Sequence, residues 1–541
     1  MRNMKRTFIL LSIFFIYCFS FEAQTISKKM ATEVAIQYIK KNISESAPKE
    51  SRPLIKATDL DTTYTKIISL TGVSPLYLVQ LDEGWVLVSS ELAATPILAS
   101  APIGKFPSIN EMPDGMKWLL SYYEQSMQYA RDSLNDKNII DEKWKLLMSN
   151  DNLISQTRDD NPIQQRSPTS YIITDLALVL WNQNDNNSSG TLDCNKVYNK
   201  FCPTWYTPFC GHTVVGCTNV AIGMAMWYYK WPYSAIIPNS IDSLTNISLE
   251  KHFVAYNWDI MPTAIYNSTD TNIVNEVAGF LRDCGYANKT KYKPQSSSAS
   301  FDSAKYSLEH TFHYKTVSHK KRNQYIGNWI NKLKTEISAD RPVIYAGYGP
   351  NGGHAFVLFG YDSDDKFNIN WGWGGESNSG TYSLDALSPS TLSNGPYNDT
   401  QEALWGIEPD YPNCGSTTYS LQQSDVNVNN FEIYRGGAIS ASNITINNNR
   451  SGVIFSGESV TLGSGFKIEA GSHVVIDVKD MHCDDRMAET EAYEGELDAR
   501  HAPQRTESYQ ITSTANKILR DGHIYIFRDG KVYSIIGLCV R

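Results

Sequence analysis

The segment GGHAFVLFGYDSDDKFNINWGWGG, residues 352–375, contains the pattern that decides the fold. An apolar run at 355–359 is followed by polar turn residues, and a second run at 367–371 then returns. This pattern predicts a β-hairpin. The hairpin would bring Asn370 back beside His354, where the Asn side chain could accept a hydrogen bond from one imidazole nitrogen and orient the other.

Three further residues of this hairpin support a functional site. Gly353 precedes His354 in a Gly-Gly-His sequence, and Trp371 and Trp373 follow the returning strand. The two indole rings could shield the expected hydrogen bond from water and strengthen it. A single His is more often structural, so it is the combination of Gly-Gly-His, apolar strand and returning Asn-Trp-Gly-Trp-Gly that favours a site.

A second segment, VVGCTNVAIGMAMWYYKWP at 214–232, supplies a candidate nucleophile, Cys217. Apolar residues recur at helical spacing from 220 to 228, and Pro232 ends the pattern. Gly216 allows a sharp turn into this helix. Cys217 is therefore expected at a helix N-terminus, where the partial positive charge favours a thiolate. The alternative is a small Cys that packs a helix end.

Two other polar residues precede Cys217. Gln183, in the sequence LWNQ at 180–183, could donate its amide to a developing oxyanion together with the backbone N–H of Cys217. The alternative for Gln183 is a solvated surface residue. His212 is rejected as the base because a turn residue five positions from the nucleophile seldom has suitable geometry, whereas His354 has an expected orienting partner.

The composition limits the class of protein. The chain has 541 residues, of which 41% are hydrophobic and 12% aromatic, which is enough apolar material for buried cores. Its 48 basic and 57 acidic residues give a net charge of −9, which argues against nucleic acid as a partner. The long apolar run at the N-terminus is the only one, so a polytopic membrane protein is excluded.

The N-terminal residues 1–23 have the pattern of a secretory signal peptide. Basic residues at positions 2, 5 and 6 precede an apolar stretch at 8–21 and small residues near a cleavage point. The alternative is an uncleaved membrane anchor. Export would permit disulfides among the eight cysteines that follow residue 23. The spacing lacks a zinc-finger pattern, and the connectivity of Cys194, Cys202 and Cys210 stays open.

Several changes of pattern along the chain predict its organisation. An α+β unit has helices at 29–41 and 113–131 and strands at 76–79 and 85–88. Polar residues 151–169 resemble a protease-accessible linker. The Gly-punctuated strands after 414 predict either a sandwich or a solenoid-like stack. The predicted parts are a signal peptide at 1–23, an α+β domain at 24–160, a large domain at 166–413, a β-rich module at 414–480, a linker at 481–510 and a hairpin tail at 511–541.

The motifs GCTNVAIGMAMWYYKWP, GGHAFV and INWGWGG resemble the streptopain family of bacterial cysteine peptidases, within the papain-like superfamily. The upstream sequences GWVLVSSELAATPILAS and MPDGMKWLLSYYEQ resemble the inhibitory prodomain of that family, so the resemblance covers about residues 25–410. It implies an α+β fold: a papain-like catalytic domain of two subdomains, an α+β prodomain before it and a β-rich module after it. It also implies Gln183 as oxyanion donor, Cys217 as nucleophile, His354 as base and Asn370 as orienter, with Trp371, Trp373 and Gly353 in support.

The resemblance implies a secreted cysteine endopeptidase made as a zymogen, with protein and peptide substrates and its own propeptide as intramolecular inhibitor. No metal or organic cofactor is expected, no nucleic acid partner, and no integral membrane segment after signal cleavage. The family often favours a bulky apolar residue two positions before the cut. The segment 193–211 resembles an insertion beside the cleft.

Two alternatives to the peptidase stay open from the sequence. The chain could be an inactive papain-like surface or adhesion protein in which the β module binds. The same residues could also transfer the acyl group to an amine rather than to water. The protein could be released or held at the cell surface, and the tail could be a sorting signal or a plain hairpin.

Overall fold

The computed structural model describes residues 25–45, 64–134, 142–148, 170–385, 401–481 and 516–534, apart from gaps at 73, 82–83, 103, 207, 242–247, 350–351, 375–379, 413–416, 480, 521–522 and 529–530. The expected signal peptide, the linker at 151–169 and nearly all of the linker at 481–510 lie outside the described residues. The helices of the described part include none with the length and apolar character needed to span a membrane.

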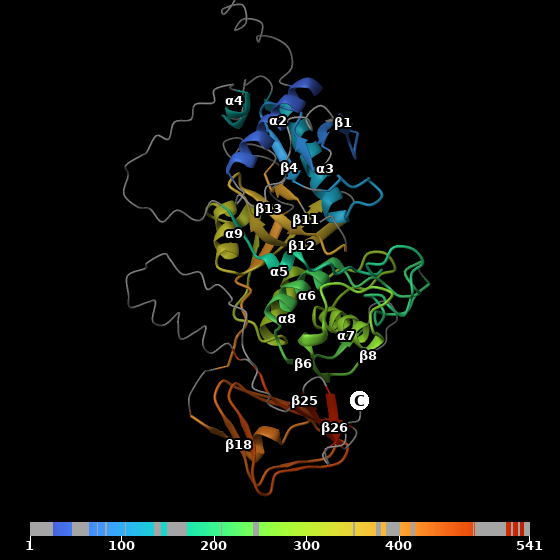
Figure 1. Ribbon diagram of the computed structural model, residues 1–541, viewed down its shortest axis with the longest axis vertical. Helices are drawn as coiled ribbons and strands as arrows, with labels where there is room; N and C mark the ends of the chain where they lie inside the picture. The colour runs from blue at the N-terminus through green and yellow to red at the C-terminus, as the bar shows by residue number, and fades with distance from the viewer. Residues whose placement is uncertain are drawn as a thin grey trace, which may run out of the picture.

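The described part of the chain forms three bodies stacked along the long axis of the molecule (Figure 1). An N-terminal α+β body lies at one end, a larger α+β body lies in the middle, and a β-rich body lies at the other end. Helices and strands both occur throughout the first two bodies, which confirms the predicted α+β class.

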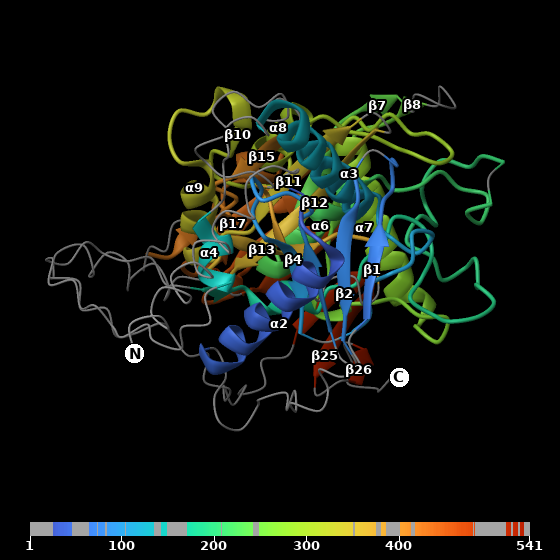
Figure 2. The same cartoon turned by 90° about the horizontal axis from the view of Figure 1, so that it is seen from above.

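The N-terminal body is an antiparallel sheet with helices packed against it (Figure 2). Apolar residues of its first helix recur every three to four positions and lie against the sheet and Trp144 in one buried cluster. The predicted helices and strands are present, with helices that begin within a residue of the expected positions. The elements are α2 (Lys28–Glu45), β1 (Tyr64–Ile68), β2 (Leu76–Gln80), β3 (Trp85–Val88), β4 (Ile97–Ala101), α3 (Asp114–Tyr129) and α4 (Glu142–Met148).

The middle body contains the segments that suggested a site. Its helices α5 to α8 gather on the side away from the N-terminal body (Figure 1). The elements are β5 (Tyr171–Ile172), α5 (Thr174–Ala177), α6 (Cys217–Tyr229), β6 (Ser234–Ile237), β7 (Ser240–Ile241), β8 (Ser248–Leu249), β9 (His252–Ala255), α7 (Thr271–Ala287), α8 (Phe301–His310), β10 (Ser318–Lys321), α9 (Trp329–Ser338), β11 (Val343–Gly349), β12 (Gly352–Tyr361), β13 (Lys366–Asn370), β14 (Thr381–Ser383) and β15 (Gln401–Trp405).

One continuous sheet joins the first two bodies. Its strand order is β1-β2-β3-β4-β14-β13-β12-β11-β15-β10, with β5 paired to β12 beside this path. The junction is the antiparallel pair β4·β14, in which Ser100 lies opposite Thr381 and Ala99 opposite Tyr382. The Tyr123 hydroxyl reaches across this junction to backbone carbonyls of both bodies. The N-terminal body is thus held by backbone hydrogen bonds as well as by side-chain packing.

The helix α6 runs beneath the sheet and carries Cys217 as its first residue. Its N-cap is Gly216, whose φ of +95° is a conformation that favours glycine. Asn219, in the first turn, is fully buried and donates to the Val215 carbonyl (2.7 Å) and the Thr290 hydroxyl (2.9 Å). These bonds fix the start of the helix, and with it the position of Cys217.

The C-terminal body is a stack of parallel strands. The strands β17, β20 and β23 pair in parallel along one face, and β16, β18 and β21 along another. This parallel pairing identifies the solenoid-like stack, rather than the sandwich, of the two expected alternatives. Its strands are β16 (Tyr419–Ser420), β17 (Asn430–Arg435), β18 (Ile439–Ala441), β19 (Thr445–Ile446), β20 (Ser451–Ser456), β21 (Val460–Leu462), β22 (Lys467–Ile468) and β23 (His473–Val478).

Three antiparallel strands follow the stack. The strand β24 (Asn516–Arg520) pairs with β23, and β25 (His523–Arg528) pairs with both β24 and β26 (Lys531–Ser534). The C-terminal segment therefore extends the solenoid sheet.

The solenoid docks on the middle body through aromatic rings. Tyr434 lies 5.5 Å from Trp231 and 5.6 Å from Phe455 between ring centroids, and Phe455 lies 5.9 Å from Tyr233. Phe455 is 2% exposed. Such ring pairs add to the free energy gained by burying the apolar area. These contacts therefore hold the solenoid in a fixed position on the middle body.

We expect Phe455→Ala to weaken this dock. Truncation of a buried Phe costs about 3 to 5 kcal/mol, because it removes apolar contacts and leaves a cavity. The midpoint of thermal unfolding should fall, and limited proteolysis should separate the solenoid faster. Leu462→Ala is the control, since Leu462 is 47% exposed. Equal proteolysis of the two variants would contradict the fixed dock.

Candidate active site

The structure brings Cys217 and His354 together. Cys217 begins α6, His354 lies in β12, and their side chains share a hydrogen bond. His354 is 4% exposed, whereas Cys217 is only partly buried. The imidazole is therefore held inside the protein, at the edge of which Cys217 lies.

The two groups shift each other's pKa toward the ionised pair. Burial acts to raise the pKa of the Cys217 thiol, but the His354 charge, its hydrogen bond and the backbone N–H groups of Ala355 and Thr218 outweigh burial and lower this pKa. Burial acts to lower the pKa of His354, but Cys217 and the Trp371 carbonyl outweigh it and raise this pKa. Both directions favour a thiolate beside an imidazolium.

The Trp371 carbonyl, and not the Asn370 side chain, is the partner of the His354 ring. His354 Nε2 lies 3.0 Å from the Trp371 carbonyl oxygen. A carbonyl can only accept, so Nε2 carries a proton and the Nδ1 atom is left for Cys217. The carbonyl thus performs the orienting role that the sequence assigned to the Asn370 amide.

Asn370 has a different set of partners, and its expected role is corrected. Its Nδ2 atom donates to the carbonyls of Leu176 (2.9 Å) and Val179 (2.7 Å), and its Oδ1 atom accepts from the Gly372 N–H (3.1 Å). The physical reason is register, because Asn370 lies opposite Val357, three residues beyond His354 in β12. Asn370 anchors the turn that presents the Trp371 carbonyl.

Gln183 lies next to the segment that leads into Cys217. The Val215 N–H donates to the Gln183 carbonyl at 2.9 Å, two residues before Cys217. Gln183 is 8% exposed, and its side-chain amide makes no hydrogen bond to another described residue. The amide therefore has unused donors beside the start of α6.

The three supporting residues lie around the imidazole. Trp371 is fully buried, and the Trp373 ring lies edge-on to the His354 ring at 6.1 Å between centroids. Gly353 lies beneath the ring of Tyr348, and a Cβ atom at Gly353 would overlap that ring. The absence of a side chain at Gly353 therefore lets Tyr348 lie beside the pair.

Helix α3 of the N-terminal body covers the same pair. A Cβ atom at Gly115 would overlap His354 Cδ2 and would lie 2.7 Å from Trp371 Cε3. One turn later the Trp118 ring occupies the space above Gly347 in β11, so that a Cβ there would overlap the indole. The backbone of α3 thus lies directly on the imidazole.

Three features of this site were not found from the sequence. They are the Trp371 carbonyl, the contact of Gly115 with His354, and the position of Tyr348. A backbone carbonyl leaves no residue-type signal, and the Gly115 contact joins segments more than 200 positions apart.

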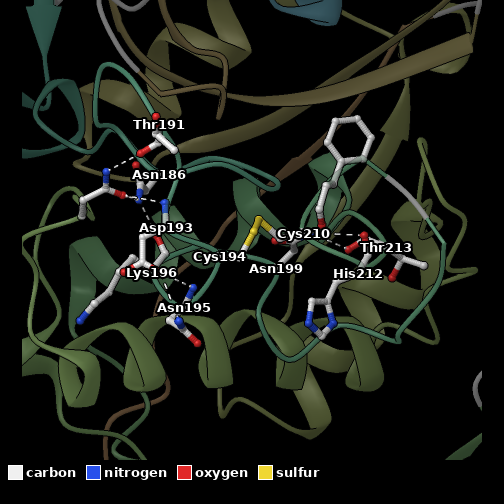
Figure 3. The surroundings of a disulfide bond; sticks show 12 residues. Asn186, Thr191, Asp193, Cys194, Asn195, Lys196, Asn199, Cys210, His212 and Thr213 are labelled. Atoms are coloured by element: carbon white, nitrogen blue, oxygen red, sulfur yellow. Dashed lines mark hydrogen bonds between the residues drawn. A yellow bond between two sulfur atoms is a disulfide. The ribbon is translucent and has the colours of Figure 1, made fainter.

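The segment 193–211 is closed by a disulfide between Cys194 and Cys210, with 5.3 Å between their Cα atoms (Figure 3). Cys202, between them, is buried and takes no part in this disulfide. The His212 ring hydrogen-bonds to the Cys202 carbonyl through Nδ1 at 2.9 Å, which ties this His to the insertion. Among the described residues, no group of three or more His, Cys, Asp or Glu side chains could hold a metal ion.

Two family models match the chain. The model of the Peptidase C10 family matches residues 193–382, and the model of the Spi protease inhibitor matches residues 23–127. Together with the relatives below, these matches support the streptopain family for this chain. The middle body is α+β, and a propeptide domain of the Spi type precedes it.

Individual relatives agree with this family. Streptopain from Streptococcus pyogenes is 27% identical over 401 residues, which are 71% of this chain and 92% of the relative. The thiol protease/hemagglutinin PrtT of Porphyromonas gingivalis is 27% identical over 393 residues, which are 68% of this chain but only 42% of PrtT. A fragment of prointerpain A from Prevotella intermedia has a TM-score of 0.49 and 20% identity, and the match covers 64% of this chain and 99% of the fragment.

The lowered pKa of Cys217 predicts early alkylation by iodoacetamide. The rate at Cys217 should rise with pH at a midpoint below about 8.5, the ordinary value for a free thiol. In His354→Gln the pH midpoint of alkylation should rise by about one pH unit or more. Burial raises the pKa of Cys217, and in this variant only the backbone N–H groups act to lower it. Mass spectrometry of the Cys217 peptide measures both rates.

Cys284 serves as an internal control in the same samples. Burial and the charge of Asp283 raise the pKa of the Cys284 thiol well above its ordinary value, so it should react slowly at every pH tested. Identical pH profiles for Cys217 and Cys284 would contradict an activated thiol at position 217.

Proposed function

We propose that the protein is a secreted cysteine endopeptidase that is made as a zymogen. The single observation that carries the proposal is the Cys217–His354 pair, whose mutual hydrogen bond and charge favour a thiolate at the N-terminus of α6. The matches to the streptopain family support the same chemistry. The N-terminal signal sequence supports export.

The Cys217 thiolate attacks the carbonyl carbon of a peptide bond. The carbonyl oxygen becomes an oxyanion, which accepts hydrogen bonds from the Gln183 amide and the backbone N–H of Cys217. The collapse of this intermediate breaks the C–N bond, and His354 gives the Nδ1 proton to the leaving amine. The Trp371 carbonyl keeps the Nε2 proton in place, which holds the ring in one tautomer.

Water then hydrolyses the acyl-enzyme. His354 takes a proton from the water and returns it to the sulfur as the acid product leaves. Neither step requires a metal ion or an organic cofactor. The pKa shifts of Cys217 and His354 and the position of Gln183 beside the start of α6 support a working peptidase over an inactive surface protein.

The N-terminal body is proposed to hold the zymogen inactive. Its helix α3 occupies the face of His354 and Trp371, and β4 completes the sheet at β14. A substrate backbone cannot lie where Gly115 and Trp118 lie. Maturation would cut the linker at 151–169 and release this body.

Cys217→Ala should abolish the conversion of the full chain to its mature form and the digestion of casein that follows this conversion, both measured under reducing conditions. The change removes the nucleophile, so a loss of at least about 10⁴-fold is expected for a group of this kind. His354→Ala should cost a comparable factor, because the two residues act as a unit. Equal digestion by the Cys217→Ala and unchanged chains would remove Cys217 from the mechanism.

Gly115→Leu should speed the conversion of the full chain to its mature form. A Leu side chain would overlap His354 and Trp371, so α3 would be pushed off the site. Gel analysis of the conversion over time should show a rate several times that of the unchanged chain. Gln125→Leu, at a partly exposed position of the same helix, is the control. Conversion at the same rate in both variants would argue against inhibition through this contact.

A further inference from the structure

A cavity of about 270 Å³ is lined by Tyr348, whose ring contacts the residue before His354, and it has no part in the mechanism above. Its walls are Ser300, Phe301 and Asp302 at the start of α8, His319 and Lys321 in β10, Tyr348 in β11, and Gln401 and Glu402 in β15. The N-terminal body contributes no lining residue. A volume of this size, just below the usual range for whole small-molecule ligands, suits a single side chain.

Tyr348 connects the cavity to the nucleophile. Its ring lies against Gly353, the residue before His354, and pairs in register with it across β11 and β12. The Cys217 charge is among the causes that raise the pKa of the Tyr348 hydroxyl, after burial and the Glu402 carboxylate. A substrate held at Cys217 would therefore have a side chain within reach of the cavity.

The cavity floor is a chain of hydrogen-bonded polar groups. The Tyr348 hydroxyl donates to Glu402 Oε1. His319 Nε2 lies 2.8 Å from Glu402 Oε2, and His319 Nδ1 lies 2.7 Å from an oxygen of Asp302. Both ring nitrogens of His319 thus face carboxylates, so the imidazolium form is favoured.

Glu402 has unused capacity to bind a donor. A carboxylate offers about four lone-pair sites, and the Glu402 side chain accepts two hydrogen bonds among the described residues. The Glu402 side chain is only 9% exposed, so solvent screens its charge weakly. Burial acts to raise the pKa of Glu402, but the bonds from His319 and Tyr348 outweigh it and lower this pKa. Glu402 therefore stays ionised, while the protonated His319 and Lys321 balance the charges of Glu402 and Asp302.

Gln401 also lines the cavity and is 1% exposed. Gln401 and Glu402 are successive residues of β15, so their side chains point to opposite faces of the sheet. The Gln401 side chain accepts from Arg322 and Tyr345 on one face, and Glu402 meets His319 and Tyr348 on the other. The polar group available to an occupant is therefore the Glu402 carboxylate.

We infer that this cavity is a specificity subsite that takes a basic side chain, Lys or Arg, of the peptide substrate. The inference rests on the proposed peptidase function. The cation would pair with Glu402, and a guanidinium plane could lie against the exposed ring of Tyr348. Lys321, which lies directly opposite Glu402 in the sheet, also lines the cavity and helps to lower the pKa of Glu402, so a substrate cation would compete with Lys321 as well as with His319. The subsite departs from the bulky apolar preference that the family resemblance implies.

Cleavage of matched peptides by the mature protein tests the subsite. The probes are fluorogenic peptides that carry Arg or norleucine at one position, scanned over the three positions on each side of the cut. At one position kcat/KM should be higher for Arg than for norleucine. Glu402→Gln should lower this Arg-to-norleucine ratio about tenfold or more, the factor expected for losing one charge-assisted hydrogen bond.

A second variant should move the same ratio in the opposite direction. His319→Gln removes one of the two cations that compete for Glu402, so the Arg-to-norleucine ratio should rise. Glu408→Gln is the matched control, because Glu408 pairs with Lys315 and does not line the cavity. Its ratio should stay as in the unchanged protein.

The ratio should also rise with pH. The hydrogen bond to Glu402 raises the pKa of His319, so the imidazolium persists above its ordinary range and is lost only at higher pH. The charged groups around it are Asp302 of α8, Glu402 of β15 and Lys321 of its own strand, while Phe301 contributes an apolar ring. Loss of the His319 proton leaves one net negative charge in this set.

Three outcomes would overturn the subsite while peptide cleavage remains intact. They are the absence of any position that favours Arg, equal loss on both peptides in Glu402→Gln, and a shift in the same direction in His319→Gln and Glu402→Gln. Failure to cleave any peptide would instead count against the proposed peptidase function.

Discussion

The hydrogen bond from His354 Nε2 to the Trp371 carbonyl is the constraint on which the site depends. It fixes the ring, the tautomer and the nitrogen that faces Cys217. The carbonyl is held in turn by the Asn370 side chain, which ties the turn after β13 to the carbonyls of Leu176 and Val179. The ionisation of the Cys217 sulfur therefore depends on the Trp371 backbone carbonyl, and the Asn370 side chain acts indirectly by holding that carbonyl in place.

The N-terminal body makes extensive contacts with the middle body, although we propose that it is released. Its strands continue the central sheet through β4 and β14, and its residues share a continuous buried cluster with the middle body. The solenoid docks at the opposite end of the middle body, through a separate set of aromatic contacts (Figure 1). Departure of the N-terminal body would consequently leave the dock of the solenoid untouched.

Local patterns predicted the elements well. Gly216 and the spacing of apolar residues predicted a helix that begins at Cys217, and the runs at 355–359 and 367–371 predicted the hairpin. The register between β12 and β13 could not be predicted, because the strand pairing shifts between Leu358 and Gly360 and no local sequence pattern indicates this shift. The resulting offset is the reason that a backbone carbonyl, rather than the Asn370 amide, meets the imidazole.

Contacts between distant segments could not be predicted. The pairing of β4 with β14 joins residues more than 280 positions apart, and the cavity at Glu402 combines four elements whose sequences carry no shared motif. The solenoid and the sandwich share the same alternation of apolar and polar residues, so only the observed parallel pairing separates them.

The length of β14 has a consequence for solubility. Removal of the N-terminal body would leave β14 as an edge strand, with unpaired N–H and C=O groups. Long, flat edges of this kind recruit other chains and promote aggregation, but β14 spans only three residues, Thr381–Ser383. Release of the N-terminal body would thus not expose a strand long enough to act as a template for β-pairing with other molecules.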